Sequence, residues 1–266
     1  MKIVGAWYAV RKELETTLNR LFEVQPENLV EFDSLLSLDD FNALGYARNF
    51  PHLSCLMCSI DAEDMKAFSE GEKQINSNYS PSETRMGLLP ATCYKVYLGL
   101  QGQALSDSRT IGCIAKCFRY EDKALDEYRA FNFTMKEFVC LGSPDTAKKY
   151  IEQGAMLIER FMTELDIKFV FETASDPFFD ISSSVAVLSK ALPTKQEILF
   201  NDHAVASLNY HRNYFGRKLD ITLNSDHIHT SCVAFGLERW IAMFKDCFQE
   251  PKAALDRLEQ FKTSIA

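Results

Sequence analysis

No stretch of this sequence approaches the length of a membrane span, which needs roughly 18 consecutive apolar residues. Its first residues, MKIVGAWYAVRKELE, lack an A-x-A-like cleavage site, so we expect mature protein and not a secretory signal peptide. Internal repeats and low-complexity linkers are also absent. These absences argue against a membrane-spanning or secreted protein.

A surplus of positive charge is missing as well. Lysine and arginine number 29, aspartate and glutamate number 37, and the formal net charge at pH 7 is -8. Non-specific binding of nucleic acid needs clustered lysine and arginine that neutralise phosphates, so this balance disfavours such a function. A local basic cleft is still compatible with this net charge.

Cysteine is present, but not in the pattern of a disulfide framework. The 8 cysteines are scattered through a long chain without a signal peptide, so free buried thiols or metal ligands are the better interpretations. Cys55-x-x-Cys58 has no second C-x-x-C partner, and we expect no function for it. Cys113 and Cys117 fall on one strand face and are expected in the core. The reducing cytoplasm is the expected compartment.

Helical periodicity marks the middle of the chain and both of its ends. The length of 266 residues allows one large domain or two small ones. The clearest helix spans 143–165, where Ser143 and Pro144 form a start signal. The other predicted helices span 9–24, 37–44, 236–248 and 251–265.

Short runs of β-branched and aromatic residues predict strands, and 80–87 is predicted as a polar surface loop. Because the strands follow one another with one long helix between them, we expect an α+β fold with a largely antiparallel sheet. The predicted strands span 92–100, 110–121, 133–142, 168–174, 195–200, 204–211 and 218–223.

The segment from 117 to 137 combines residue types that suit nucleotide binding. Arg129, Phe133 and Glu137 are spaced four apart, which would place them on one face of a strand. An arginine fork suits a phosphate, an aromatic ring suits a purine, and an inward carboxylate suits an ammonium group or a metal. A hairpin with surface charges and one core aromatic explains the same pattern, and spacing alone favours this second interpretation.

The segment HTSCVAFGLERWIAMF, at 229–244, places a glutamate and an arginine between two hydrophobic runs. Gly236 would let a strand pass closely into a helix, whose first turn would hold Glu238 and Arg239 and favour phosphate. Two arginine sites, each with a glutamate nearby, suit an enzyme that activates its substrate with a triphosphate, because arginine stabilises charge as pyrophosphate leaves.

These two segments resemble motifs 2 and 3 of the class II aminoacyl-tRNA synthetases, most closely those of the seryl-tRNA synthetase branch. More narrowly, the chain resembles the amino acid:[carrier protein] ligases, compact bacterial relatives of the zinc-dependent seryl-tRNA synthetases of methanogens. The resembling segments occur in the family's order, at 46–53, 89–97, 117–121, 135–142, 174–179, 207–216 and 229–239.

The resemblance implies a single class II synthetase-like catalytic domain over residues 1–266, usually homodimeric and without a tRNA-binding arm. The segment before Cys93 shows no sustained heptads that could form such an arm. The implied partners are a small amino acid and the phosphopantetheine arm of a carrier protein, with neither tRNA nor a membrane. Carrier proteins are usually acidic, so a basic docking patch is expected.

The resemblance also implies a Zn²⁺ site with Cys93, Glu137 and Cys232 as ligands. Three protein ligands and an open position are the arrangement of a functional zinc, and the open position would bind the amino group of the substrate. Taken alone, each cysteine is better explained as a small core hydrophobe.

The remaining site residues follow from the same resemblance. Catalysis would rest on Arg119 and Arg239, and the implied pocket residues are Asp176, Asn209 and His211. The implied ATP-binding residues are Arg119, Glu121, Arg129, Phe133, Glu197 and Arg239, with Mg²⁺ on the phosphates and Glu197 as a candidate Mg²⁺ ligand. We assign no role to the His227-x-His229 pair.

Two positions depart from the family pattern. Asp180 stands where a glycine usually follows the DPFF segment, which would place a carboxylate near the amino-acid or pantetheine pocket. Lys136 stands where an arginine is expected. Neither departure removes a zinc ligand or a motif arginine.

The implied reaction is ATP-dependent formation of an aminoacyl-adenylate from glycine or alanine, followed by transfer to the phosphopantetheine thiol. Two alternatives remain open. A synthetase paralogue could aminoacylate another acceptor in small-molecule biosynthesis, or a non-catalytic relative could bind an amino acid as a sensor. Absent pyrophosphate exchange with retained amino-acid binding would favour the sensor.

Overall fold

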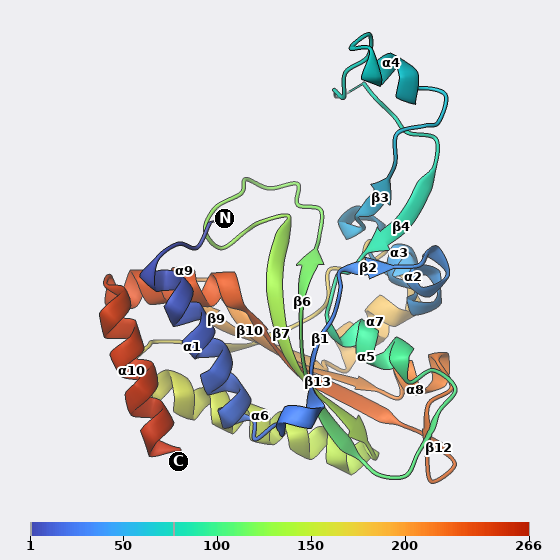
Figure 1. The fold of residues 1–266 in the computed structure, drawn as a ribbon. Coiled ribbons are helices and arrows are strands. Elements are labelled where there is room, and N and C mark those ends of the chain that lie inside the picture. Colours follow the sequence, from blue (N-terminus) through green and yellow to red (C-terminus); the bar gives the residue numbers. More distant parts are fainter. Residues whose placement is uncertain (1, 77, 266) are drawn as a thin grey trace.

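A computed structural model describes residues 2–76 and 78–265. Its centre is a 7-stranded sheet of order β1-β6-β7-β13-β10-β9-β8 (Figure 1). β1 pairs with β6 in parallel, and the remaining neighbours pair antiparallel, as the sequence predicted. The strands are β1 (Leu29–Glu31), β6 (Arg109–Phe118), β7 (Asn132–Gly142), β8 (Val170–Ala174), β9 (Lys195–Phe200), β10 (His203–Arg212) and β13 (His229–Gly236).

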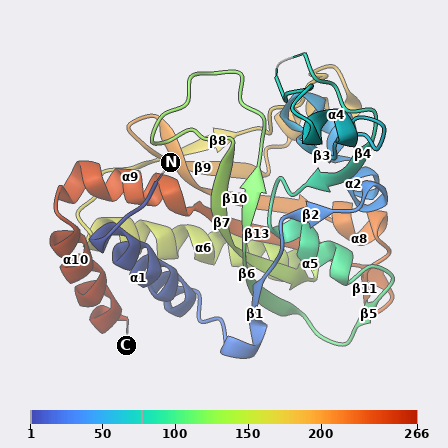
Figure 2. The ribbon, with the colours of Figure 1, turned by 45° about the horizontal axis from the view of Figure 1, so that its top comes forward.

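Long amphipathic helices cover one face of this sheet and bury its larger apolar cluster. Figure 2 shows them along the lower and left side of the molecule. The predicted start signal holds, because the Ser143 hydroxyl accepts a hydrogen bond from the Thr146 N–H at 3.2 Å. The helices are α1 (Ala6–Leu21), α6 (Pro144–Glu164), α9 (Leu237–Phe248) and α10 (Pro251–Ser264).

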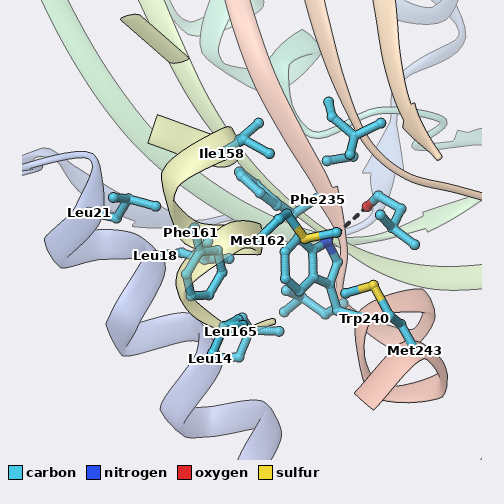
Figure 3. Packing of buried hydrophobic residues seen from close by; sticks show 14 of the residues in the cluster. Leu14, Leu18, Leu21, Ile158, Phe161, Met162, Leu165, Phe235, Trp240 and Met243 are labelled. Carbon is cyan, nitrogen blue, oxygen red and sulfur yellow. Dashed lines mark hydrogen bonds between the residues drawn. The ribbon is translucent and has the colours of Figure 1, made fainter. Parts of the chain in front are cut away.

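Trp240 anchors the first turn of α9 in this cluster. Its ring is fully buried and stacks at 5.3 Å on Phe161 of α6 (Figure 3). Its indole N–H donates to the carbonyl of Val205 in β10 at 2.9 Å. Burial of such a side chain stabilises the fold by roughly 1.5–3 kcal/mol. Its neighbour Arg239, about 100° away around the helix, bonds instead to the carbonyls of Tyr128 and Ala204.

Shorter helices cover the second face, where a separate apolar cluster forms. Residues of the central strands alternate between the two clusters, since Phe138 and Val233 belong to the first and Val139 and Cys232 to the second. Cys113 and Cys117 are fully buried in this second cluster, as expected. The helices are α2 (Leu38–Leu44), α3 (Tyr46–Asn49), α5 (Cys93–Gly99), α7 (Ser184–Ala191) and α8 (Tyr214–Lys218).

Two small sheets complete the described fold. One, of order β2-β4-β3, carries α4 (Met65–Ser69) away from the body at the top of Figure 1. No helix among the described residues is long and apolar enough to cross a bilayer. The strands are β2 (Leu35–Leu36), β3 (Leu56–Cys58), β4 (Thr84–Leu88), β5 (Ala104–Leu105), β11 (Thr222–Leu223) and β12 (Asp226–His227).

Three local predictions are wrong. Residues 92–100 form helix α5 and not a strand, because the buried Cys93, Val96, Tyr97 and Leu100 recur at helical spacing despite their β-branched and aromatic surroundings. The predicted loop at 80–87 contains most of strand β4, and of the predicted strand at 218–223 only the last two residues form a strand, β11, after the end of α8 and a turn.

Candidate functional site

A cavity of about 760 Å³ opens on the face of the sheet that carries the shorter helices. Strands β7, β10 and β13 contribute residues to it, together with the loop between β6 and β7 and the first turn of α9. Every residue that the sequence assigned to the site lines this cavity: Cys93, Arg119, Glu121, Arg129, Phe133, Glu137, Asp176, Glu197, Asn209, His211, Cys232 and Arg239.

Cys93, Glu137 and Cys232 converge from three different elements. Cys93 opens α5, Glu137 lies in β7 and Cys232 in the neighbouring β13, and one ligand atom from each lies within 4.8 Å of the others. All three side chains are buried, and the Cys93 N–H donates to Glu137 Oε1 at 3.0 Å. Burial raises the pKa of the Cys93 thiol well above its ordinary value. Two thiols and one carboxylate match the donor atoms that Zn²⁺ takes in proteins, so these residues fit the expected metal.

Asn209 and His211 of β10 surround the Cys232 sulfur. Asn209 Nδ2 lies 3.5 Å from Sγ, and His211 Nε2 lies 4.0 Å from it. On its other side, His211 Nδ1 is 3.3 Å from the Tyr97 hydroxyl and 3.2 Å from that of Thr230. Burial lowers the pKa of His211 to about 4, so the ring is neutral at pH 7.

Arginines gather at the end of the cavity beside the loop between β6 and β7. Arg119 lies 5.3 Å from the centre of the Phe133 ring, and its Nε–H donates to the Pro90 carbonyl at 3.0 Å. Arg239 is held by the carbonyls of Tyr128 and Ala204, both at 2.7 Å. Burial, followed by the charges of Arg119 and Arg129, lowers the pKa of Arg239. Excess positive charge in a half-buried cavity favours an anionic ligand.

No family model matches the chain. Two amino acid–[acyl-carrier-protein] ligases of Bradyrhizobium diazoefficiens are each 31% identical to it, over 249 and 230 residues. These alignments cover 86% and 81% of this chain and 74% and 70% of the two relatives. The chain belongs to the amino acid–[acyl-carrier-protein] ligase family.

More distant similarities are to seryl-tRNA synthetases. The type-2 serine–tRNA ligase of Methanothermobacter thermautotrophicus is 26% identical over 277 residues, which cover 90% of this chain and 52% of that protein. The solved M. kandleri SerRS, in complex with A. aeolicus tRNASec, superposes with a TM-score of 0.77 at 18% identity, over 96% of this chain and 55% of that one. Seryl-tRNA synthetase from Pyrococcus horikoshii complexed with ATP superposes with a TM-score of 0.65 at 12% identity, over 96% of this chain and 56% of that one. The expected class II synthetase-like fold is confirmed.

The expected pairing of each arginine site with a glutamate holds at one site of this ligase and fails at the other. Arg129 Nη1 lies 2.6 Å from Glu121 Oε2. Glu238, in contrast, accepts hydrogen bonds from the backbone and hydroxyl of Thr134 at 2.6 and 2.8 Å and pairs with Lys116 at 2.7 Å. Arg239 bonds instead to two backbone carbonyls, through Nε and Nη1.

The predicted shared strand face applies only in part to the ligase. β7 begins at Asn132, so Phe133 and Glu137 share a face of a strand, whereas Arg129 reaches the cavity from the preceding loop. The prediction assumed regular strand geometry across the whole segment. The charged loop before β7 instead brings Arg129 to the cavity that Phe133 and Glu137 also line.

Lys195 is a cavity residue that the sequence interpretation missed. Its ammonium group lies 3.0 Å from Asp176 and 2.9 Å from Glu197, so it connects the segment after β8 to strand β9. The two carboxylates raise its pKa even though burial opposes the charge. Alternation within KQEILF places Lys195 and Glu197 on one strand face, and this was the available signal.

Neither departure from the family pattern changes the cavity wall. Asp180 is exposed and is not among the residues that line the cavity, although Phe178 and Val185 on either side of it are. Its carboxylate accepts hydrogen bonds from the backbone and hydroxyl of Ser182 at 2.9 and 2.6 Å. A carboxylate in contact with the substrate at this position stays a prediction. Lys136 is buried on the opposite face of the sheet, with its ammonium group 5.2 Å from the Phe138 ring.

Proposed function

We propose that this ligase activates a small amino acid with ATP as an aminoacyl-adenylate and transfers the aminoacyl group to the phosphopantetheine thiol of a carrier protein. One observation carries the proposal: a single cavity joins an arginine-rich end, suited to a nucleotide, to a buried Cys-Glu-Cys cluster suited to a metal. The relatives named as amino acid–[acyl-carrier-protein] ligases support both the reaction and the acceptor.

In the first step, a carboxylate oxygen of the amino acid attacks the α-phosphorus of ATP. The new oxygen–phosphorus bond forms while the bond to the bridging oxygen breaks, and pyrophosphate leaves. Arg119 would hold the α-phosphate and the attacking carboxylate through its terminal nitrogens, since its Nε–H is occupied by Pro90. Arg129 and Arg239 would hold the outer phosphates, where pre-positioned charge stabilises the departing group.

The adenine would stack on Phe133, whose half-buried ring lines the cavity beside Arg119. Glu121 would accept from the amino edge of the base while remaining paired with Arg129. Mg²⁺ would accompany the phosphates, and Glu197 is our candidate for its protein ligand. Glu197 pairs with Lys195 through Oε1 in this structure, and its second carboxylate oxygen would be the one offered to magnesium.

Cys93, Glu137 and Cys232 would hold Zn²⁺, which when bound offers an open coordination position to the substrate amino group. Asn209 and His211 approach the Cys232 sulfur to within 4.0 Å and would line the site beside the metal. Glycine or alanine is the amino acid that we propose. Asp176, fixed by Lys195, would form the outer wall of the amino-acid pocket.

In the second step, the pantetheine sulfur attacks the carbonyl carbon of the adenylate. The sulfur–carbon bond forms, the bond from carbon to the phosphate oxygen breaks, and AMP leaves. The thiol proton passes to the departing phosphate or to water. A thiol is a good nucleophile near neutral pH, so no strong protein base is required.

The proposal also covers the number of domains, the oligomeric state and the acceptor. We propose that residues 1–266 act as one catalytic domain within a homodimer, with a carrier protein and not tRNA as the acceptor. The continuous sheet supports one domain, because both apolar clusters share its central strands.

ATP–pyrophosphate exchange against all standard amino acids, on zinc-loaded protein, tests the first step. We expect exchange with glycine or alanine. Transfer is then measured to a carrier protein with its phosphopantetheine arm, to the same carrier without it, and to tRNA. Exchange with no amino acid, on folded and zinc-loaded protein, would favour a binding-only sensor, whereas transfer to tRNA alone would overturn the choice of acceptor.

A further inference from the structure

The cavity has a second cationic end, opposite the nucleotide end. We call it the distal end, and it comprises Arg212 at the last position of β10 and Arg217 and Lys218 of α8, all of which line the cavity. Ala204, whose carbonyl holds Arg239, lies near the other end of β10. Arg212 lies eight positions after Ala204, which corresponds to at most about 26 Å of strand at about 3.3 Å per residue, because the register shifts at both ends of this span. The distal cations are therefore too far away to share the phosphates of one ATP with Arg239.

The distal cations have no acidic partner among the residues that the structure describes. None of the three forms an ion pair within residues 2–76 and 78–265. The carboxylates that line the cavity cannot neutralise them, because each is engaged elsewhere. Glu137 belongs to the metal cluster, and the others pair with cations: Glu121 with Arg129, Glu127 with Lys245, Asp176 and Glu197 with Lys195, and Glu238 with Lys116.

Helix α8 is held rigidly between this end and the metal cluster. Phe215 stacks at 4.2 Å on Tyr97 of α5, the helix that begins with Cys93. Gly216 packs so closely against the Ile228 backbone that a Cβ atom there would lie 2.3 Å from the carbonyl oxygen. Figure 1 shows α8 beside α5, on the side of the sheet away from α9. The backbone that carries Arg217 and Lys218 is thus fixed relative to α5 and the metal cluster.

We propose that the distal end binds the phosphate group of the acceptor's pantetheine arm, with Arg212, Arg217 and Lys218 as its cationic ligands. The inference rests on the proposed function and adds the position of the acceptor. A guanidinium fork matches phosphate oxygens, and the exposed Arg217 and Lys218 leave room for the attached carrier.

The arm is long enough to reach this position. Asn209, which is paired with the metal-cluster residue Cys232, lies three positions before Arg212, or at most about 10 Å along the strand, because the register shifts between Tyr210 and Arg212. A pantetheine chain extends roughly 15 Å from thiol to phosphate, if it advances per bond as an extended polypeptide does. A thiol placed beside the metal cluster would therefore leave its phosphate within reach of the distal end.

Comparing acceptors with and without the phosphate tests the site. Transfer of the aminoacyl group is measured to pantetheine, to phosphopantetheine and to the complete carrier protein. In Arg217→Gln and Lys218→Gln, we expect kcat/KM for phosphopantetheine to fall about tenfold, the effect of losing one charge-assisted hydrogen bond. In the same variants, kcat/KM for pantetheine should stay within about twofold of the wild-type value, since pantetheine has no phosphate. Arg257→Gln removes an exposed charge from α10, remote in the fold from the cavity lining, and serves as the matched control.

Three results would overturn the site. An equal loss for pantetheine and phosphopantetheine would show that the cations do not recognise phosphate. A loss for the carrier protein alone would place them against its acidic surface instead. Equal Kd values of wild-type protein for the two free thiols, measured by calorimetry, would exclude the site even if catalysis could not be followed. Failure of pyrophosphate exchange, by contrast, would refute the proposed function, and the calorimetric comparison would still decide the phosphate site.

Discussion

Arg119→Gln is the substitution that most directly tests the nucleotide end of the cavity. In the structure, Nε of Arg119 is occupied by the Pro90 carbonyl at 3.0 Å, and the terminal nitrogens remain for the α-phosphate. Glutamine can keep one N–H donor, but it removes the positive charge from a half-buried position. Loss of one pre-positioned stabilising group typically costs about 2.7–4 kcal/mol in the transition state. We therefore expect kcat for pyrophosphate exchange to fall about 100- to 1000-fold.

Arg119→Lys tests whether the positive charge alone is sufficient or whether the two-pronged guanidinium is also needed. Lysine restores the charge, but its single ammonium group cannot donate to Pro90 and present a two-pronged fork to the substrate at once. We expect an activity between those of Arg119→Gln and wild type, with kcat reduced about 10- to 100-fold. Because the proposed interaction strengthens as pyrophosphate leaves, kcat should change more than KM.

The assay needs evidence that each variant is folded. Removal of Arg119 leaves the Pro90 carbonyl without its donor, which costs roughly 1–3 kcal/mol of stability if the group stays buried. Thermal unfolding and zinc content are therefore measured beside exchange, and Arg257→Gln again provides the control. If Arg119→Gln retains more than about a fifth of the wild-type kcat while folded, Arg119 does not act on the reacting phosphate.

Three further substitutions test the metal cluster, the position of α8 and the response to pH. Cys232→Ser should reduce bound zinc and weaken its affinity by at least about 100-fold, measured by competition with a chromophoric chelator, because serine replaces a thiolate ligand. Gly216→Ala should destabilise the fold by about 1–3 kcal/mol in denaturant unfolding, because the new Cβ would lie 2.3 Å from the Ile228 carbonyl oxygen. A hydrogen bond from Ser264 lowers the pKa of Glu164 below its ordinary 4.5, so its stabilising effect is present above pH 4.5 and disappears as pH falls through the folded-state value. Glu164→Gln should therefore lower Tm at pH 7 and have less effect at pH 3.

Each of these predictions has a matched control and an opposing result. Unchanged zinc affinity in Cys232→Ser would remove this residue from the metal site. A Gly216→Ala protein as stable as wild type would show that α8 can move away from the neighbouring backbone. An equal Tm shift for Glu164→Gln at both pH values would rule out a contribution from its ionisation. The controls are Cys247→Ser on the exposed part of α9, Gly99→Ala in open space at the end of α5, and Glu159→Gln on the exposed face of α6.

Local signals in the sequence predicted the longer elements well. The Ser-Pro start at 143–144 and the apolar periodicity that follows it gave the limits of α6 to within one residue at its C-terminal end. The antiparallel sheet also followed from the order of short apolar runs. The segment 92–100 was misassigned because β-branched and aromatic residues suggested a strand, whereas burial of one helical face against the sheet determined its structure.

The residues of the candidate site were predicted through motif resemblance, and all of them line one cavity. Their contacts were not predicted. Glu238 was expected near Arg239 and instead binds Thr134 and Lys116, and Lys195 was overlooked. The catalytic and ligand roles themselves remain predictions.

The sequence alone determined the kind of fold, the family and the chemical groups available for function, because periodicity and motif spacing are properties of neighbouring positions along the chain. Only the tertiary structure decided which of those groups meet. Cys93, Glu137 and Cys232 come together from a helix and two strands, and the unpaired cations of α8 lie at the far end of the same cavity. The physical reason is that burial, ion pairing and hydrogen bonding depend on distances between residues remote in sequence, which the packing of helices on both faces of the sheet sets.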